Sequence, residues 1–239
     1  MDYSQYSLAK TGYLKEDFRL FHINDRTDRE FEWHYHDFHK IIVFVSGKVT
    51  YHIEGKAYQL KPQDILLVSQ GAIHKPEIDP SIPYERYIFW IRDDLSSPEL
   101  NTCFQKANDR SFNLIRLDSV LQEKLKDLLP EIEHSLRDTQ FGDSLLSKAL
   151  FAQFMVYINR IFLKSSSAPD QKSYSSDSQV EQLLKYINRN LSENLSIDHL
   201  AERFFFSKYH MMRKFKKETG YTIHNYIISK RLLLSLIHI

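Results

Sequence analysis

The hydrophobic periodicity of this chain changes along its length, and that change limits its fold more than any other feature. Between Phe18 and Ile91, short runs of β-branched and aromatic residues are separated by Gly, Pro and Asp. Such runs are typical of an antiparallel sandwich or barrel. From Ser119 onward, apolar residues recur every three or four positions, which predicts helices. The pattern therefore predicts an α+β chain with an N-terminal β domain.

The expected elements follow from these two periods. Within the β domain we expect strands at Lys40–Val45, Lys48–Glu54, Lys56–Leu60, Asp64–Val68 and Tyr84–Ile91. Two amphipathic helices follow, with apolar stripes over Ser119–Leu129 and Leu145–Phe162. The segment Lys164–Gln179 is rich in Ser and has no apolar period, so it is predicted to be a linker. We place an N-terminal arm at 1–17, the β domain at 18–163, the linker at 164–177 and a helical domain at 178–239.

Charge is distributed unevenly between these parts. The chain has 32 Lys or Arg and 31 Asp or Glu, a formal net charge of +1. Residues 180–239 hold ten of the basic and five of the acidic residues. A basic module on a mildly acidic body favours a nucleic-acid partner. No apolar run is long enough to span a membrane and no signal peptide is evident, so a cytoplasmic location is expected.

Three helices are predicted in the basic module, and polar residues mark where they begin. Ser178, Ser196 and Ser207 each precede a helical pattern and are suitable N-caps, and Gly220 is a suitable residue to end the third helix. Two helices joined by a short turn, the second of them basic, form a helix-turn-helix. The arrangement predicts binding to double-stranded DNA.

The third helix carries different residues on its two sides. At 100° per residue, Tyr209, Met212, Arg213 and Lys216 share one face, while Met211 and Phe215 lie opposite. A helix anchored by Met and Phe can enter the major groove, where Arg reads guanine and Lys neutralises phosphate. The alternative is a solvated basic face, but the caps, the turn and the charge excess favour DNA binding.

The segment "LSIDHLAERFFFSKYHMMRKFKKETGYTIHNYIISKRL", Leu195–Leu232, resembles the first helix-turn-helix of AraC/XylS-type transcription regulators. The resemblance implies that Tyr209, Met212 and Arg213 read bases. With them we group as DNA-binding candidates Ser207, Lys208, Lys216 and Lys217. Members of that family have a second helix-turn-helix after a connecting helix, which here begins at Thr222. We therefore expect this domain to be incomplete and the natural sequence to diverge near Leu234.

The β domain contains the segment "HYHDFHKIIVFVSG", which resembles the first motif of cupins. His34 and His36 are two apart on a strand, so their rings share a side, and His74 could add a third imidazole. Lys40 occupies the position of the cupin glutamate, and its positive charge repels a divalent cation. We therefore expect no bound metal and no cofactor.

The family resemblance also implies what the β domain does. AraC-type regulators sense a small-molecule effector with a cupin-like barrel and act as dimers, so a homodimer is expected. We take as effector-site candidates the polar and aromatic residues Trp33, His34, His36, Lys40, Tyr51, His74 and Trp90, although aromatic strand residues are more often plain core. Sugars or related metabolites are possible effectors.

Three functions remain open from the sequence. The favoured one is a DNA-binding transcription regulator, not an enzyme, controlled by an effector. The second is a metal-dependent cupin enzyme with a helical appendage, against which Lys40 argues. The third is a dimerising inhibitor of a full-length regulator, which the absence of the second module from this chain permits.

Overall fold

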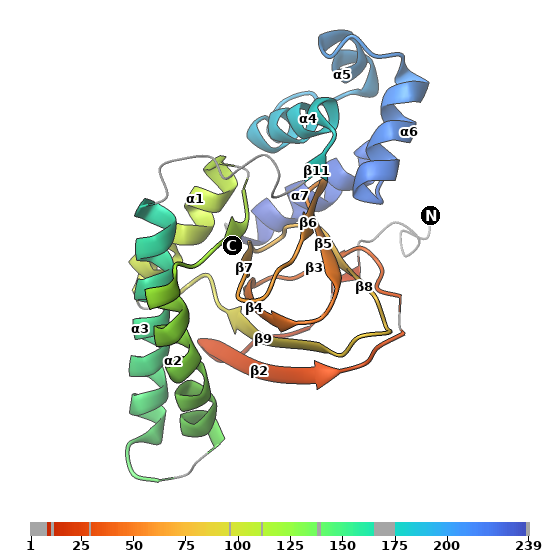
Figure 1. Ribbon diagram of the computed structural model, residues 1–239. Helices are drawn as coiled ribbons and strands as arrows, with labels where there is room; N and C mark the ends of the chain where they lie inside the picture. The colour runs from red at the N-terminus through yellow and green to blue at the C-terminus, as the bar shows by residue number, and fades with distance from the viewer. Residues whose placement is uncertain are drawn as a thin grey trace.

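The computed structural model describes residues 9–10, 12–28, 30–95, 97–110, 112–137, 140–164 and 175–237. Side chains are described for these residues except 9–10, 175–176 and 233–237. Most of the expected arm, the linker residues 165–174, and the side chains of the expected divergent end Leu234–Ile239 lie outside this description. The α+β prediction is confirmed, because a β domain of two sheets is followed by a purely helical module (Figure 1).

Two sheets form the β domain. The first has six strands in the order β1-β3-β8-β5-β6-β11, and the second has five in the order β10-β7-β4-β9-β2. The strands of the first sheet are β1 (Ala9–Lys10), β3 (His34–Tyr35), β8 (His74–Ile78), β5 (Val49–Ile53), β6 (Lys56–Gln59) and β11 (Ser175–Ser176). Those of the second are β10 (Leu114–Ile115), β7 (Ile65–Val68), β4 (His39–Ser46), β9 (Tyr84–Ile91) and β2 (Phe18–Asp25). All five predicted strands are present, with ends shifted by no more than one residue.

Alternation along the strands of the second sheet creates two separate cores. On β4, Ile42 and Phe44 point between the two sheets, whereas Ile41 and Val43 point to the opposite side. The space between the sheets is filled mainly by aliphatic and aromatic side chains. The other side of the five-stranded sheet is a second apolar surface that helices cover.

Those helices are α1 (Thr102–Arg110), α2 (Ser119–Arg137) and α3 (Asp143–Lys164), and a short 3₁₀ turn, Pro98–Asn101, precedes α1. The helices α2 and α3 lie side by side along the sheet (Figure 1). Phe154 of α3 stacks on Phe89 of β9, with ring centroids 4.4 Å apart. The helix α1 was not expected from the sequence, and α2 continues through Pro130, because Ile132 extends its buried face.

The C-terminal module consists of α4 (Ser178–Arg189), α5 (Ile197–Arg203), α6 (Lys208–Thr219) and α7 (Ile223–Ile237). Its helices share a core that also contains Ile73 of the β domain. The segment before α4 is not a free linker over its whole length, because β11 pairs antiparallel with β6. The module therefore packs on the β domain, above it in Figure 1. None of the helices in the described part of the chain is long and apolar enough to cross a membrane.

The turn between α5 and α6 contains a non-glycine residue in a left-handed backbone conformation, which a substitution can test. Phe205 has a φ of 56° and a side chain that is 96% exposed. A residue with a Cβ is disfavoured by about 1 kcal/mol or more in this left-handed region, whereas Gly is not. We expect Phe205→Gly to be more stable than Phe205→Ala by about 1 kcal/mol, measured by urea unfolding. Because both variants lose the ring, equal midpoints would contradict the left-handed turn.

Candidate functional site

The helix α6 is held at both ends and along one side. The Ser207 hydroxyl accepts a hydrogen bond from the backbone N–H of His210 at 3.4 Å. Gly220 ends the helix in a left-handed conformation, and its N–H donates to the carbonyl of Lys216. Met211 and Phe215 are buried in the core of the module. The predicted caps and the predicted inward face of this helix are confirmed.

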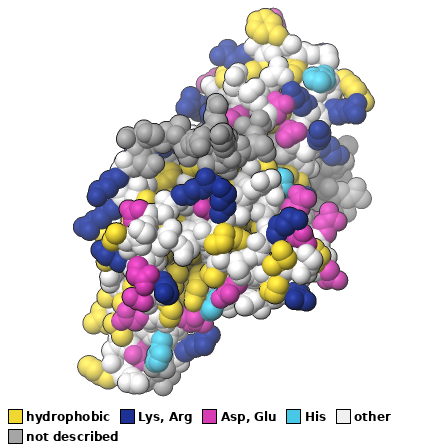
Figure 2. All heavy atoms as spheres, in the orientation of Figure 1, with side chains coloured by type: hydrophobic (Ala, Val, Ile, Leu, Met, Phe, Trp, Pro, Cys, Tyr) yellow, Lys and Arg dark blue, Asp and Glu magenta, His cyan; other side chains and the backbone are white. Residues whose placement is uncertain are grey.

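The opposite face of α6 is open to solvent. Tyr209 is 72% exposed and Met212 is 41% exposed. Arg213, Lys216 and Lys217 are exposed, and none of them forms an ion pair with a residue that the structure describes. Figure 2 shows Lys and Arg side chains over this lobe of the molecule, with acidic side chains between them. This face presents cations, an aromatic ring and a thioether to a partner.

Two basic residues of α6 are engaged within the module. Lys208 forms an ion pair with Asp198 of α5. Lys214 pairs with Asp177 at 2.8 Å and donates to Gln179 at 2.7 Å. Asp177, rather than the predicted Ser178, is the N-cap of α4, since its carboxylate accepts from the N–H groups of Gln179 and Val180. Asp177 is favoured over Ser178 as the N-cap because its carboxylate caps the helix and also forms an ion pair with Lys214.

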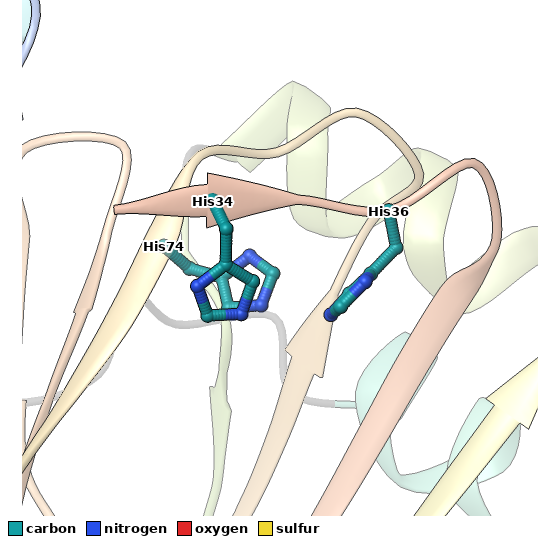
Figure 3. A group of neighbouring side chains, drawn as sticks. All are labelled: His34, His36 and His74. Carbon is teal, nitrogen blue, oxygen red and sulfur yellow. The ribbon is translucent and has the colours of Figure 1, made fainter. Parts of the chain in front are cut away.

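Six of the seven effector-site candidates come together between the two sheets. The rings of His34, His36 and His74 lie 4.4–5.1 Å apart between centroids (Figure 3). Tyr51 stacks near His74 at 5.9 Å, and Lys40 donates a 3.2 Å hydrogen bond to the Tyr51 hydroxyl. Lys40 lies directly opposite Trp90 in the register of β4 and β9.

The remaining candidate, Trp33, lies elsewhere. It immediately precedes His34, so strand alternation turns its side chain to the outer side of the sheet, where it packs against the helical module. The same alternation identifies interior residues that the sequence analysis missed. Phe38 stacks on Trp90 at 4.6 Å, and Tyr84 and Arg86 follow the same face of β9 as Trp90. Counting alternate residues back from Trp90 would have found Tyr84 and Arg86.

The histidines are held in defined tautomers. Nδ1 of His34 lies 2.8 Å from the carbonyl oxygen of Glu32, and Nδ1 of His74 lies 2.8 Å from that of Ala72. A carbonyl only accepts, so each Nδ1 carries the proton and each Nε2 presents a lone pair when the ring is neutral. Burial is the main cause that lowers the pKa of both rings, and the nearby Lys40 charge adds to it.

These imidazoles are the group in the described part of the chain that could hold a metal ion. One ring nitrogen from each of His34, His36 and His74 lies within 4.8 Å of the others. Backbone carbonyls at the far nitrogens are the usual support for metal-bound histidines. Lys40 stands beside the cluster, however, and its ammonium disfavours any further cation there.

The end of α6 rests on the β domain at Trp33. The Tyr221 hydroxyl donates a hydrogen bond to the carbonyl of Trp33. A Cβ at Gly220 would lie 2.1 Å from the Trp33 ring, so only Gly fits at this contact. The helix α6 therefore ends against the residue that immediately precedes His34.

A polar contact fixes α7 to the same side of the β domain. Lys230 donates to Glu54 at 2.7 Å and to the carbonyl of Gly71 at 2.9 Å. The hydroxyl of Tyr226 donates to Glu54 as well. Glu54 also accepts a hydrogen bond from the N–H of Ile73, which immediately precedes His74. This charged contact has no signature in the sequence, since its members are far apart along the chain.

Comparison with known proteins gives two family matches. Residues 19–155 match the family described as the AraC-like ligand binding domain. Residues 187–227 match the bacterial regulatory helix-turn-helix proteins of the AraC family.

Relatives with curated names are transcriptional activators. The chain is 22% identical to the activator RhaR of Mannheimia succiniciproducens, over 84% of this chain and 71% of that protein. It is 20% identical to RhaS of Citrobacter koseri, over 85% and 72%.

Solved structures that match include the AraC-like transcriptional activator CuxR, with 16% identity and a TM-score of 0.38 over 83% of this chain and 67% of that one. Another is ToxT from Vibrio cholerae bound to an unsaturated fatty acid, with 12% identity and a TM-score of 0.41 over 93% and 82%. The first family match alone spans more than half of the residues. The chain therefore belongs to the AraC family of bacterial transcription regulators, in which a ligand-binding domain precedes a DNA-binding helix-turn-helix.

Proposed function

We propose that the exposed face of α6 reads DNA, that a small molecule binds between the two sheets, and that the contacts at Trp33 and Glu54 link the two events. The observation that carries this proposal is that adjacent residues at β3 and β8 face opposite sides of the sheet. His34 and His74 face the inside of the β domain, while their neighbours Trp33 and Ile73 face the helical module. A ligand that displaces His34 and His74 would therefore also displace Trp33 and Ile73, on which the helical module packs.

On the DNA side, Tyr209, Met212 and Arg213 are assigned to base contacts. Their support is the shared exposed face and a helix that is capped and anchored from behind. Arg213 can fork onto guanine, and Met212 can offer only an apolar contact, for example to a thymine methyl group. Ser207, Lys208, Lys216 and Lys217 are assigned to the phosphate backbone.

Arg213 and Lys217 form a matched pair for testing this assignment. Arg213→Ala should weaken specific binding by about 1–3 kcal/mol and relax the preference at one base pair, whereas Lys217→Ala should weaken binding to all sequences alike. Fluorescence anisotropy with operator and random duplexes at fixed salt measures both. Retention of the full operator preference by Arg213→Ala would refute the recognition face.

The effector would act through thermodynamic linkage between its own binding and the arrangement of the helical module. A ligand shifts the arrangement of the helical module only by as much as it binds one arrangement better than another. The described polar contacts between the parts include those of Tyr221 with Trp33, of Lys230 and Tyr226 with Glu54, and of Lys56 with Glu181 at 3.0 Å. Of these, the Tyr221 contact is made by the residue that precedes β3, so a displacement of β3 by a ligand would act on it directly.

We further propose a homodimer through α3. Much of the expected apolar stripe of this helix, including Leu150, Phe154 and Ile158, is buried against the chain's own β domain and helices. A second stripe remains exposed or half-exposed at helical spacing, and it consists of Leu145, Ala149, Ala152, Val156 and Leu163. Small and aliphatic residues at intervals of three, four and seven suit a close helix pair.

A charge placed on this second stripe should separate the dimer. We expect Ala152→Glu to raise the dissociation constant at least about tenfold, because a carboxylate would be buried in an apolar seam. Sedimentation equilibrium at micromolar concentration measures this, with exposed Ser144→Glu as a control of equal charge. A wild-type chain that is monomeric under these conditions would contradict the dimer.

The rival function, a metal-dependent enzyme, depends on the histidine cluster. The named relatives are transcriptional activators, and Lys40 disfavours a divalent cation beside the imidazoles. We therefore propose that the β domain acts as a sensor and performs no metal chemistry.

Elemental analysis tests this proposal directly. Protein purified without chelators should contain well under one transition-metal ion per chain at neutral pH. Lys40→Glu is the informative variant, since it removes the repulsion and adds a fourth ligand, and it should increase metal uptake. About one Fe, Mn or Zn per wild-type chain, lost in His34→Ala, would favour the enzyme instead.

A further inference from the structure

The interior of the β domain holds one positive charge that no acidic group balances. Lys40 forms no ion pair with any residue that the structure describes, and its hydrogen bond goes to the neutral hydroxyl of Tyr51. Arg86, the other cation nearby, forms an ion pair with Asp25. Burial lowers the pKa of Lys40 to about 8, with Arg86 as a second cause, so the ammonium remains the main form at neutral pH.

An unpaired ammonium inside a protein is costly, and an anion that binds beside it offsets part of that cost. The charge itself is desolvated, because burial is the main cause that lowers its pKa. Lys40, His34 and Trp90 are nevertheless only half-buried as whole residues, so a ligand can reach the ammonium from their exposed sides. The charge of the site selects for a negative group on that ligand.

The neighbouring imidazoles add a second requirement. His74 is fully buried, its Nδ1 is occupied by the carbonyl of Ala72, and its Nε2 has no hydrogen-bond partner among the described residues. This Nε2 is a lone-pair acceptor that points toward the other histidines. Nε2 of His34, fixed by the carbonyl of Glu32, is an acceptor too. A hydrogen-bond donor on a ligand, such as a hydroxyl group, satisfies both.

We propose that the effector of this protein is a small hydroxycarboxylate, with its carboxylate on Lys40 and Tyr51 and its hydroxyl group on His74. Trp90 and Phe38, which stack on each other beside His36, form an apolar wall for the carbon skeleton. This inference rests on the proposed function, because it names the chemical class that the sensor site would recognise.

Three small probes separate the two features of this class. Acetate and acetamide have the same shape but differ in charge, and glycolate adds a hydroxyl group to acetate. Trp33→Phe leaves Trp90 as the sole tryptophan of the chain, directly opposite Lys40. Its fluorescence, titrated at constant ionic strength with chloride as the balancing anion, reports on binding beside the ammonium.

We expect glycolate to bind at least about threefold more tightly than acetate, and acetamide to give no saturable change. Lys40→Met should abolish the response to both anions, Lys40→Arg should preserve it, and His74→Phe should remove the advantage of glycolate over acetate. Lys48→Met, a surface change of equal charge, is the control and should respond like the parent. Because Lys40→Met also removes the unbalanced charge, its melting temperature without probes should rise.

Equal responses to acetate and acetamide, or a Lys40→Met variant that still binds acetate, would overturn the proposal. A saturable response to glycerol but to neither anion would also overturn it, while leaving an effector site in the β domain intact. DNA binding is measured separately with the Arg213 variant. Failure of the proposed function is therefore distinguishable from failure of the anion assignment.

Discussion

The packing of the helical module on the outer side of β3 and β8 is the interaction on which the rest of this structure depends. Ile73 enters the core of the module, Trp33 supports the end of the recognition helix, and Glu54 holds α7. Because strand residues alternate, each of these contacts lies next to a residue that faces the interior. These strands are thus the shared wall between the interior histidines and the helical module.

The rest of the fold follows from the need to cover the apolar outer sides of the two sheets. The five-stranded sheet needs cover on its outer side, and α2 and α3 provide it with residues such as Leu128, Phe151 and Phe154. This use leaves a second stripe of α3 exposed or half-exposed, which includes Leu145, Ala152 and Leu163. Within the described residues, the outer side of the six-stranded sheet is covered in part by the DNA-binding module, which is therefore packed on the β domain and not only joined to it through the chain.

The fold was largely predictable because local patterns determine it. Strand runs, the helix stripes, the caps at Ser196 and Ser207 and the end at Gly220 all depend on neighbouring residues. Prediction was weaker where a structural feature depends on a residue that is distant in the sequence. Asp177 replaces Ser178 as a cap because Lys214 lies nearby in space, and the Glu54 contacts join residues more than 170 positions apart. Trp33 was grouped with His34 by proximity in sequence, although alternation places the two on opposite sides.

Each polar contact between the two parts contributes a free energy similar to the coupling free energy that a small ligand can supply. Allosteric coupling typically amounts to about 1–3 kcal/mol. An ordinary hydrogen bond contributes about 1 kcal/mol, and one to a charged group about 1.5–3 kcal/mol. The hydrogen bond of Tyr221 to Trp33 and the Lys230 contact with Glu54 are therefore each of the size that ligand binding can outweigh. Ile73, Trp33 and Tyr35 add apolar contacts to the same interface, so a ligand that outweighs one polar link still leaves the module packed on the β domain.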